Sequence, residues 1–189
     1  IFLLTVGAVQ SAHAVFYTFG TLHWRALGLS TSLAGALWAI GVIAEIGVFA
    51  FSARIVRRVG ALQLIALGCG TAVARWLAMG FDPPVALLVP LQMLHGLTYG
   101  GAHVGAIHFM SRAVPEEQSG TAQALYASVT GGVAMGSVTL LAGPLYASAG
   151  GHAYWAMALV GLLGLGTSLW LVRASRSVAA HPHSVGSGG

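Results

Sequence analysis

The stretch SLAGALWAIGVIAEIGVFAFSA at residues 32–53, followed directly by RIVRRVG at residues 54–60, decides the fold of this chain. Only Glu45 is charged in the first part, and about 20 mostly apolar residues suffice for a helix to cross a bilayer. The second part carries three arginines, and basic residues gather in the cytoplasmic loops of membrane proteins. The stretch therefore predicts a membrane-spanning helix and the cytoplasmic loop that follows it.

The composition of the whole chain extends this prediction. Of the 189 residues, 57% are hydrophobic and 6% are charged, and the mean hydropathy is +0.83, whereas soluble domains carry about 25% charged residues. All eight basic residues are arginines, and all but Arg75 sit at the ends of apolar runs rather than along one exposed face. We therefore exclude a soluble domain and a nucleic-acid-binding protein. The single cysteine, Cys69, excludes an internal disulfide.

Similar apolar runs divide the chain into six segments. They predict an all-α, polytopic membrane protein in which residues 1–172 form one six-helix transmembrane unit. Residues 173–189 are polar and rich in Ser, Gly, Ala and His, and we expect a disordered cytoplasmic tail there. Because the chain starts inside an apolar run, we expect it to be a fragment that lacks an N-terminal part. The six predicted segments are residues 1–22, 32–53, 61–80, 84–110, 115–146 and 153–172.

The arginines orient the predicted helices. The loops on the opposite side contain only Arg25. By the positive-inside rule, the first segment starts in the cytoplasm and the C-terminus ends there, in what we expect to be the inner membrane of a bacterium. The arginines of the other loops and of the tail are Arg54, Arg57, Arg58, Arg112, Arg173 and Arg176.

Two polar stripes repeat along the chain at an offset of 82 residues. Both read Gln-x2-His-x3-Tyr, and residues three and seven apart share one face of a helix. The two helices cross in opposite directions, so the chain predicts two inverted three-helix repeats, which are typical of transporters with a substrate site at the midplane. Each polar side chain could instead bond a neighbouring helix. The first stripe is Gln10, His13 and Tyr17, and the second is Gln92, His95 and Tyr99.

Two charged residues lie inside predicted helices, where an isolated charge is costly. Burial favours the protonated form of a carboxyl group, so Glu45 is a candidate proton-coupling site, and the nearby His95 titrates in a suitable range. Glu45 could also be permanently protonated and bonded to another helix. Arg75 is a candidate cation for an anionic substrate, although it could reach the outer interface or Asp82 instead. A direct Glu45–Arg75 pair is not required, since their depths differ by about 10 Å.

Several stretches together resemble the C-terminal half of a major facilitator superfamily transporter, helices seven to twelve, and within it the phenylpropionate permease branch of the lactose-permease-like members. The positive loop lacks the acidic residue of the superfamily's loop motif. The resemblance implies two six-helix halves, of which the N-terminal one is missing here. The similar stretches are HWRALG at 23–28, LWAIGVIAE at 37–45, RIVRRVG at 54–60, RW at 75–76, LQMLHGLT at 91–98 and GPLY at 143–146.

The resemblance also implies roles for single residues. Symporters of the wider group carry a Glu on helix eight, an Arg on helix nine and a His on helix ten, and Glu45, Arg75 and His95 fall on the corresponding helices. Thr98 stands where those symporters have a second carboxylate. Helices seven and ten line the central cavity in this fold, which is where both stripes fall. We therefore assign proton coupling to Glu45 and His95, and substrate binding to Gln10, His13, Tyr17, Arg75, Gln92 and Tyr99.

The leading hypothesis is a proton-coupled secondary transporter, without cofactor or metal, for a small organic solute such as an aromatic acid. Its partners would be that solute, protons, the bilayer and the missing half. A non-transporting assembly or pigment-delivery factor on the same fold would tolerate Glu45→Gln. A membrane metal enzyme would use His103 and His108, or the tail pair His181 and His183. We expect no enzyme, because phosphate loops, nucleophile elbows and cysteine pairs are absent from the sequence.

Overall fold

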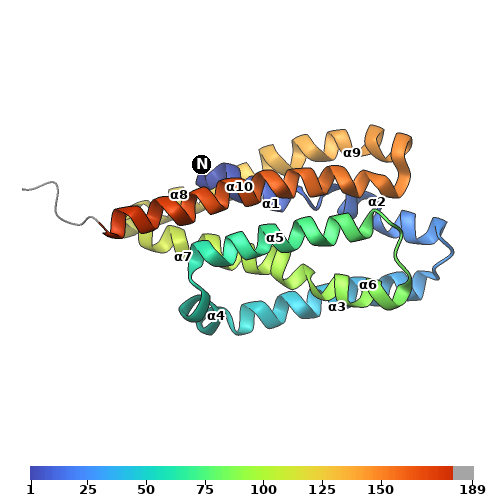
Figure 1. Cartoon of the computed structure of the whole chain (residues 1–189), viewed down its shortest axis with the longest axis horizontal. Helices are drawn as coiled ribbons and strands as arrows, with labels where there is room; N and C mark the ends of the chain where they lie inside the picture. The colour runs from blue at the N-terminus through green and yellow to red at the C-terminus, as the bar shows by residue number, and fades with distance from the viewer. Residues whose placement is uncertain (181–189) are drawn as a thin grey trace, which may run out of the picture.

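The stretch at residues 32–53 forms helix α3 (Thr31–Ala50) in the computed structural model of the chain, which describes residues 1–180. Ser30 caps this helix by accepting a hydrogen bond from the Leu33 backbone N–H at 3.2 Å. The other apolar runs also form helices, so the described chain is all-α as predicted (Figure 1). They are α1 (Phe2–Ser11), α2 (Ala14–Ala26), α5 (Ala61–Met79), α6 (Val85–Met93), α7 (Ala102–Ala113), α8 (Ser119–Ala127), α9 (Met135–Ala149) and α10 (Ala153–Ala180).

Four helical stretches of the described residues are long and apolar enough to cross a membrane. Three of them match single predicted segments, namely Phe2–Ala26, Thr31–Ala50 and Ala61–Met79. The fourth, Glu116–Ser177, runs over 62 residues and folds back between α9 and α10, so it contains the fifth and sixth predicted segments (Figure 1). The predicted fourth segment is not among these stretches. In this segment a turn at Leu94 follows α6.

Three of the long helical rods are irregular in their middle. The first rod is interrupted between α1 and α2 at Ala12 and His13. The fourth rod consists of α6, α7 and, between them, a π-helix, η1 (Gly96–Gly101). The fifth rod consists of α8, α9 and, between them, a second π-helix, η3 (Ser128–Ala134). Such π-helical turns are frequent at functional sites. These irregularities lie at the depth of the two polar stripes.

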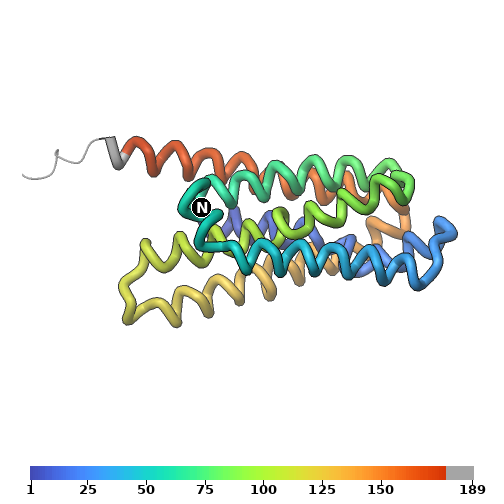
Figure 2. The backbone as a smooth tube through the Cα atoms, turned by 90° about the horizontal axis from the view of Figure 1, so that it is seen from below, coloured from blue at the N-terminus to red at the C-terminus, as the bar shows by residue number. Residues whose placement is uncertain are grey.

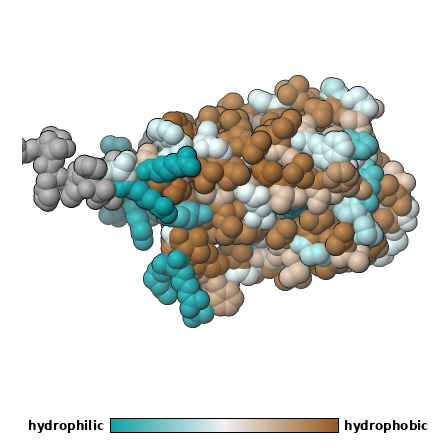
Figure 3. Space-filling model, in the orientation of Figure 1, coloured by the Kyte–Doolittle hydropathy of each residue, from teal (hydrophilic) through white to brown (hydrophobic). Residues whose placement is uncertain are grey.

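The loop at residues 54–60 is mostly helical, which the sequence analysis did not predict. Helix α4 (Ser52–Val59) buries Val56 against Leu64 and Val104 and exposes its arginines. Together with the ends of α7 and α10 it forms the arginine-rich end of the molecule (Figure 1). Hydrophilic residues gather at this end, and hydrophobic residues cover most of the visible middle (Figure 3). The arginines at this end are Arg54, Arg57, Arg58, Arg112, Arg173 and Arg176.

The first rod is the centre of the bundle. In its apolar window 67% of the residues are buried, compared with 17% for α3. Helix α10 packs beside α5 and α1, and α3 packs on α6 and η1 (Figures 1 and 2). The α8–α9 rod runs along an edge of the bundle in Figure 2, and its buried residues are few. Helix α3 and the α8–α9 rod therefore keep wide apolar faces exposed.

Helix α10 corrects the predicted boundary after Val172. It continues to Ala180, because the residues from 174 to 180 are mostly Ala, Ser and Val and no proline occurs before Pro182. Helix propensity therefore extends the rod beyond its apolar part. The rest of the predicted disordered tail, residues 181–189, lies outside the described residues.

Candidate functional site

Arg75 lies at the centre of a buried polar network between α5, α3 and the fourth rod. Its side chain is fully buried. Its Nη2 donates to Gln92 Oε1 at 2.6 Å, and its Nη1 donates to His95 Nδ1 at 3.3 Å and to Thr98 Oγ1 at 3.4 Å. The guanidinium carbon also lies 4.4 Å from the ring centroid of Trp76, a distance at which the aromatic face attracts a cation.

No carboxylate contacts this guanidinium within residues 1–180. Its acceptors are neutral, and its Nε has no hydrogen-bond partner there. A buried cation without an anion is costly, so such residues in membrane proteins mark ligand or ion sites. Arg75 thus offers positive charge that neighbouring side chains leave uncompensated.

Glu45 enters the network through His95. Its Oε2 lies 3.5 Å from His95 Nε2. Because Arg75 can only donate, it holds His95 Nδ1 as an acceptor, so the neutral ring carries its proton on Nε2 and directs it at Glu45. Glu45, His95 and Arg75 are therefore connected in series, and the ring of His95 separates the two charges.

Gly96 allows this contact between α3 and the fourth rod. A Cβ atom at Gly96 would lie 2.7 Å from the backbone carbonyl carbon and oxygen of Ala44, well inside van der Waals contact. The absence of a side chain therefore brings the backbone that carries Glu45 close to the one that carries His95.

His13 joins the same network from the first rod. Its Nδ1 lies 3.1 Å from the Val9 carbonyl and 3.2 Å from the Gln10 carbonyl. Carbonyls only accept, so Nδ1 carries the proton and Nε2 accepts from Thr98 Oγ1 at 3.1 Å. The His13 ring therefore satisfies carbonyls at the interruption of its own rod and links that rod to Arg75 through Thr98.

The two stripes meet through their rings. The His13 and His95 centroids are 5.4 Å apart, and Tyr17 lies 6.4 Å from Tyr99. Tyr99 stacks on His95 at 5.5 Å. Tyr17 is 39% exposed, so it borders the surface of this cluster.

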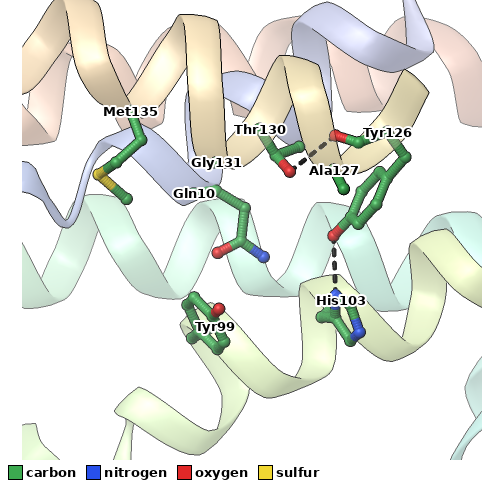
Figure 4. Close-up of a pocket in the computed structure, with 8 residues that line it drawn as sticks. All are labelled: Gln10, Tyr99, His103, Tyr126, Ala127, Thr130, Gly131 and Met135. Atoms are coloured by element: carbon green, nitrogen blue, oxygen red, sulfur yellow. Dashed lines mark hydrogen bonds between the residues drawn. The ribbon is translucent and has the colours of Figure 1, made fainter. Parts of the chain in front are cut away.

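Gln10 is the stripe residue that does not join the network of Arg75. It faces a pocket of about 230 Å³ between the first, fourth and fifth rods (Figure 4). His103 and Tyr126 bond each other there, with Nδ1 2.9 Å from the hydroxyl oxygen. Sequence analysis missed Tyr126, Thr130 and Met135, which carry no repeat or charge signal. The pocket is lined by Gln10, Tyr99, His103, Tyr126, Ala127, Thr130, Gly131 and Met135.

Asp82 does not pair with Arg75. Its Oδ1 lies 2.7 Å from His23 Nε2, and His23 Nδ1 lies 3.0 Å from the Tyr146 hydroxyl. This group, the Asp82 cluster, lies at the end of the bundle opposite to the arginine-rich end. Asp82, the alternative partner considered for Arg75, is thus bonded to His23 instead. In residues 1–180, no three His, Cys, Asp or Glu side chains gather closely enough to hold a metal ion.

Comparison with known proteins identifies the family. Residues 1–157 match the MFS_1 like family. The chain belongs to this family. Over 161 residues it is 35% identical to the "Probable 3-phenylpropionic acid transporter" of Escherichia coli (strain K12), covering 85% of this chain and 42% of that protein. The predicted resemblance to a major facilitator transporter is confirmed.

Two further relatives agree with this assignment. The chain is 24% identical to the "Uncharacterized transporter YwbF" of Bacillus subtilis (strain 168), over 94% of this chain and 45% of that protein. It is 34% identical to the "Maltose permease" of Geobacillus stearothermophilus, over 49% of this chain and 23% of that protein. No solved structure matches the chain. The chain spans less than half the length of these curated relatives.

The family and the fold together define the class of protein. MFS families are transporters, so the chain is not an enzyme. Its apolar helices and bacterial transporter relatives indicate an integral membrane protein.

Proposed function

We propose that this chain is the C-terminal half of a secondary transporter that takes up a small aromatic acid, such as 3-phenylpropionate, together with a proton. Its six helical rods would form two inverted three-helix repeats, with the arginine-rich end in the cytoplasm of a bacterial cell. The name of the Escherichia coli relative supports the substrate class. The clustering of six arginines at one end supports the orientation.

The observation that carries the proposal is the series Glu45–His95–Arg75 inside the bundle. Arg75 lacks a carboxylate partner within the described residues, so a substrate carboxylate is the ligand that would compensate its charge. Arg75 is fully buried, so a conformational change of Tyr17 or Tyr99 would have to expose it. Both rings border the cluster.

Proton coupling follows from the position of His95 between the two charged residues. An anionic substrate that draws Arg75 away from His95 would free Nδ1 to accept a proton, and the imidazolium would be stabilised by Glu45 at 3.5 Å. Substrate binding would thus favour proton binding at the Glu45–His95 pair. Gln10, His13, Tyr17, Gln92 and Tyr99 would shape the site around these groups.

Uptake of labelled 3-phenylpropionate into vesicles that contain the full-length protein tests the proposal. We expect an inward proton gradient to drive accumulation in the wild type. Glu45→Gln should abolish accumulation while it leaves exchange of internal for external substrate intact, because exchange needs no net proton movement. Glu116→Gln, at the exposed start of the fifth predicted segment, is the matched control and should accumulate normally.

Each outcome separates the hypotheses. Accumulation that survives Glu45→Gln would remove Glu45 from coupling and keep the transporter. A wild type that neither accumulates nor exchanges any aromatic acid would contradict the proposed substrate class. It would favour a non-transporting assembly or pigment-delivery factor if other solutes also failed.

A further inference from the structure

The pocket around Gln10 contains a polar atom that the fold leaves without a partner. Gln10 is 5% exposed, and its Oε1 forms no hydrogen bond within the described residues. An unpaired buried acceptor costs about 1–3 kcal/mol unless something donates to it. In Figure 4 the Gln10 amide points into the space between Tyr99 and Tyr126. The unpaired oxygen therefore favours a ligand with an O–H or N–H group.

The rest of the lining indicates what carries that donor. The pocket is built from aromatic, thioether and small side chains, and it contains no Asp, Glu, Lys or Arg. His103 is engaged with the Tyr126 hydroxyl at 2.9 Å, and the Thr130 hydroxyl donates to the Tyr126 carbonyl at 2.8 Å. A charged group would find no counterion here, so the complementary ligand is an uncharged ring with a donor.

The size of the pocket agrees with one ring. An apolar cavity of about 150 Å³ binds benzene, so a pocket of about 230 Å³ accommodates a single substituted benzene ring. We infer that this pocket binds a hydroxylated aromatic ring whose O–H donates to Gln10 Oε1.

The pocket is connected to the charged series through one residue. Tyr99 lines the pocket and stacks on His95 at 5.5 Å. A ring in the pocket therefore contacts the side chain that packs on the proton-coupling pair. This inference rests on the proposed function and deepens it, because it narrows the transported acid to one with a phenolic ring.

Equilibrium binding without a proton gradient tests the inference. The dissociation constants of 3-phenylpropionate and of its 2-, 3- and 4-hydroxyphenyl analogues are measured by calorimetry on the full-length protein in lipid nanodiscs. We expect at least one hydroxylated acid to bind about three- to tenfold more tightly than 3-phenylpropionate. Gln10→Met should remove this preference, whereas Gln123→Met should keep it. Gln123 is exposed on α8 and bonded to Ser119.

A pocket-filling variant gives a second, independent test. A side chain at Gly131 would meet no atom within 4 Å of its Cβ, so Gly131→Leu should fold and fill the pocket. We expect it to weaken binding of the preferred acid at least tenfold. Gly120→Leu is the matched control, since Gly120 is equally unobstructed and lies outside the pocket, and it should bind as the wild type does.

The results distinguish this inference from the proposed function. Equal affinities for all four acids, no binding of any hydroxylated acid, or a preference that survives Gln10→Met would overturn the phenolic pocket. If 3-phenylpropionate still accumulates in vesicles, only the pocket inference fails. A Gln10-dependent preference without accumulation would keep the pocket and overturn symport.

Discussion

In the first stripe His13 is fully buried and bonds carbonyls of its own rod, whereas in the second stripe His95 lies between Arg75 and Glu45 from two other helices. The glutamines differ in the same way, because Gln92 binds Arg75 while Gln10 Oε1 has no partner in the described chain. Identical spacing thus supports two kinds of chemistry. The neighbouring helices determine which kind each stripe acquires.

The largest difference between the stripes should come from Arg75. Arg75→Met keeps an unbranched side chain but removes the cation, so we expect labelled 3-phenylpropionate uptake to fall about 100-fold. Truncating one partner of a buried charged pair costs about 2–5 kcal/mol. Arg25→Met, in the last turn of α2, is the control and should alter uptake less than twofold. Near-normal uptake in Arg75→Met would show that the cation does not bind the substrate.

Parallel histidine substitutions test the comparison directly. His95→Gln should reduce proton-driven accumulation at least tenfold, because it removes the titrating ring between Arg75 and Glu45. His13→Gln should preserve the dependence of uptake on the proton gradient and instead lower stability by about 1–3 kcal/mol, since buried hydrogen bonds are lost. Gradient-dependent uptake and thermal unfolding of both variants are the measurements. Loss of gradient dependence in His13→Gln alone would reverse the assignment.

The residue after each histidine offers a third test. Ala14 follows His13 and is fully buried, whereas Gly96 follows His95 and nearly touches the Ala44 backbone. We expect Gly96→Ala to destabilise the protein by about 1–3 kcal/mol, because overpacking forces backbone shifts. Ala14→Gly should cost about 1–2 kcal/mol, through helix propensity and the loss of a buried methyl group, without any backbone shift. Thermal unfolding in the same detergent compares them, and an unaffected Gly96→Ala would contradict the close approach of α3.

The smallest expected effect is that of Gln10→Met, which we compare with Gln92→Met. Gln92→Met removes the 2.6 Å acceptor of Arg75 and should cost about 1.5–3 kcal/mol, as hydrogen bonds to charged groups do. Gln10→Met removes the unpaired Oε1 atom together with the hydrogen bond between the Gln10 and Tyr126 side chains. The two effects oppose each other, so stability should change by less than about 0.5 kcal/mol. Chemical unfolding in mixed micelles measures both. Equal costs would mean that Gln10 is bonded as firmly as Gln92.

Much of the fold could be predicted from the sequence. Apolar length identified the helical rods, and arginine counting identified the arginine-rich end. The interruption at Ala12 and His13 and the two π-helices could not be predicted, because no proline marks them. Helix α4 carried a signal that was overlooked, since Ile55, Val56 and Val59 alternate with arginines as an amphipathic helix requires.

The site was predicted less completely. Unusual charges inside apolar runs singled out Glu45 and Arg75, and the repeat singled out His95. The contacts between these groups could be seen only in the structure. Glu45 and Arg75 lie at different depths, and the ring of His95 contacts both of them. The partner of Asp82 depended on His23 and Tyr146, which are distant in the sequence. Sequence spacing carries no information on such contacts.

The Asp82 cluster has a mechanical consequence. It ties α2, the loop before α6 and α9 together at one end of the bundle, through contacts of 2.7 and 3.0 Å. Helices fastened at one end behave as levers with a common fulcrum, so small bends at their irregular middles become larger displacements at the free end. The free ends of these tied helical rods lie at the arginine-rich end, so Arg112 in the last turn of α7 would be displaced strongly.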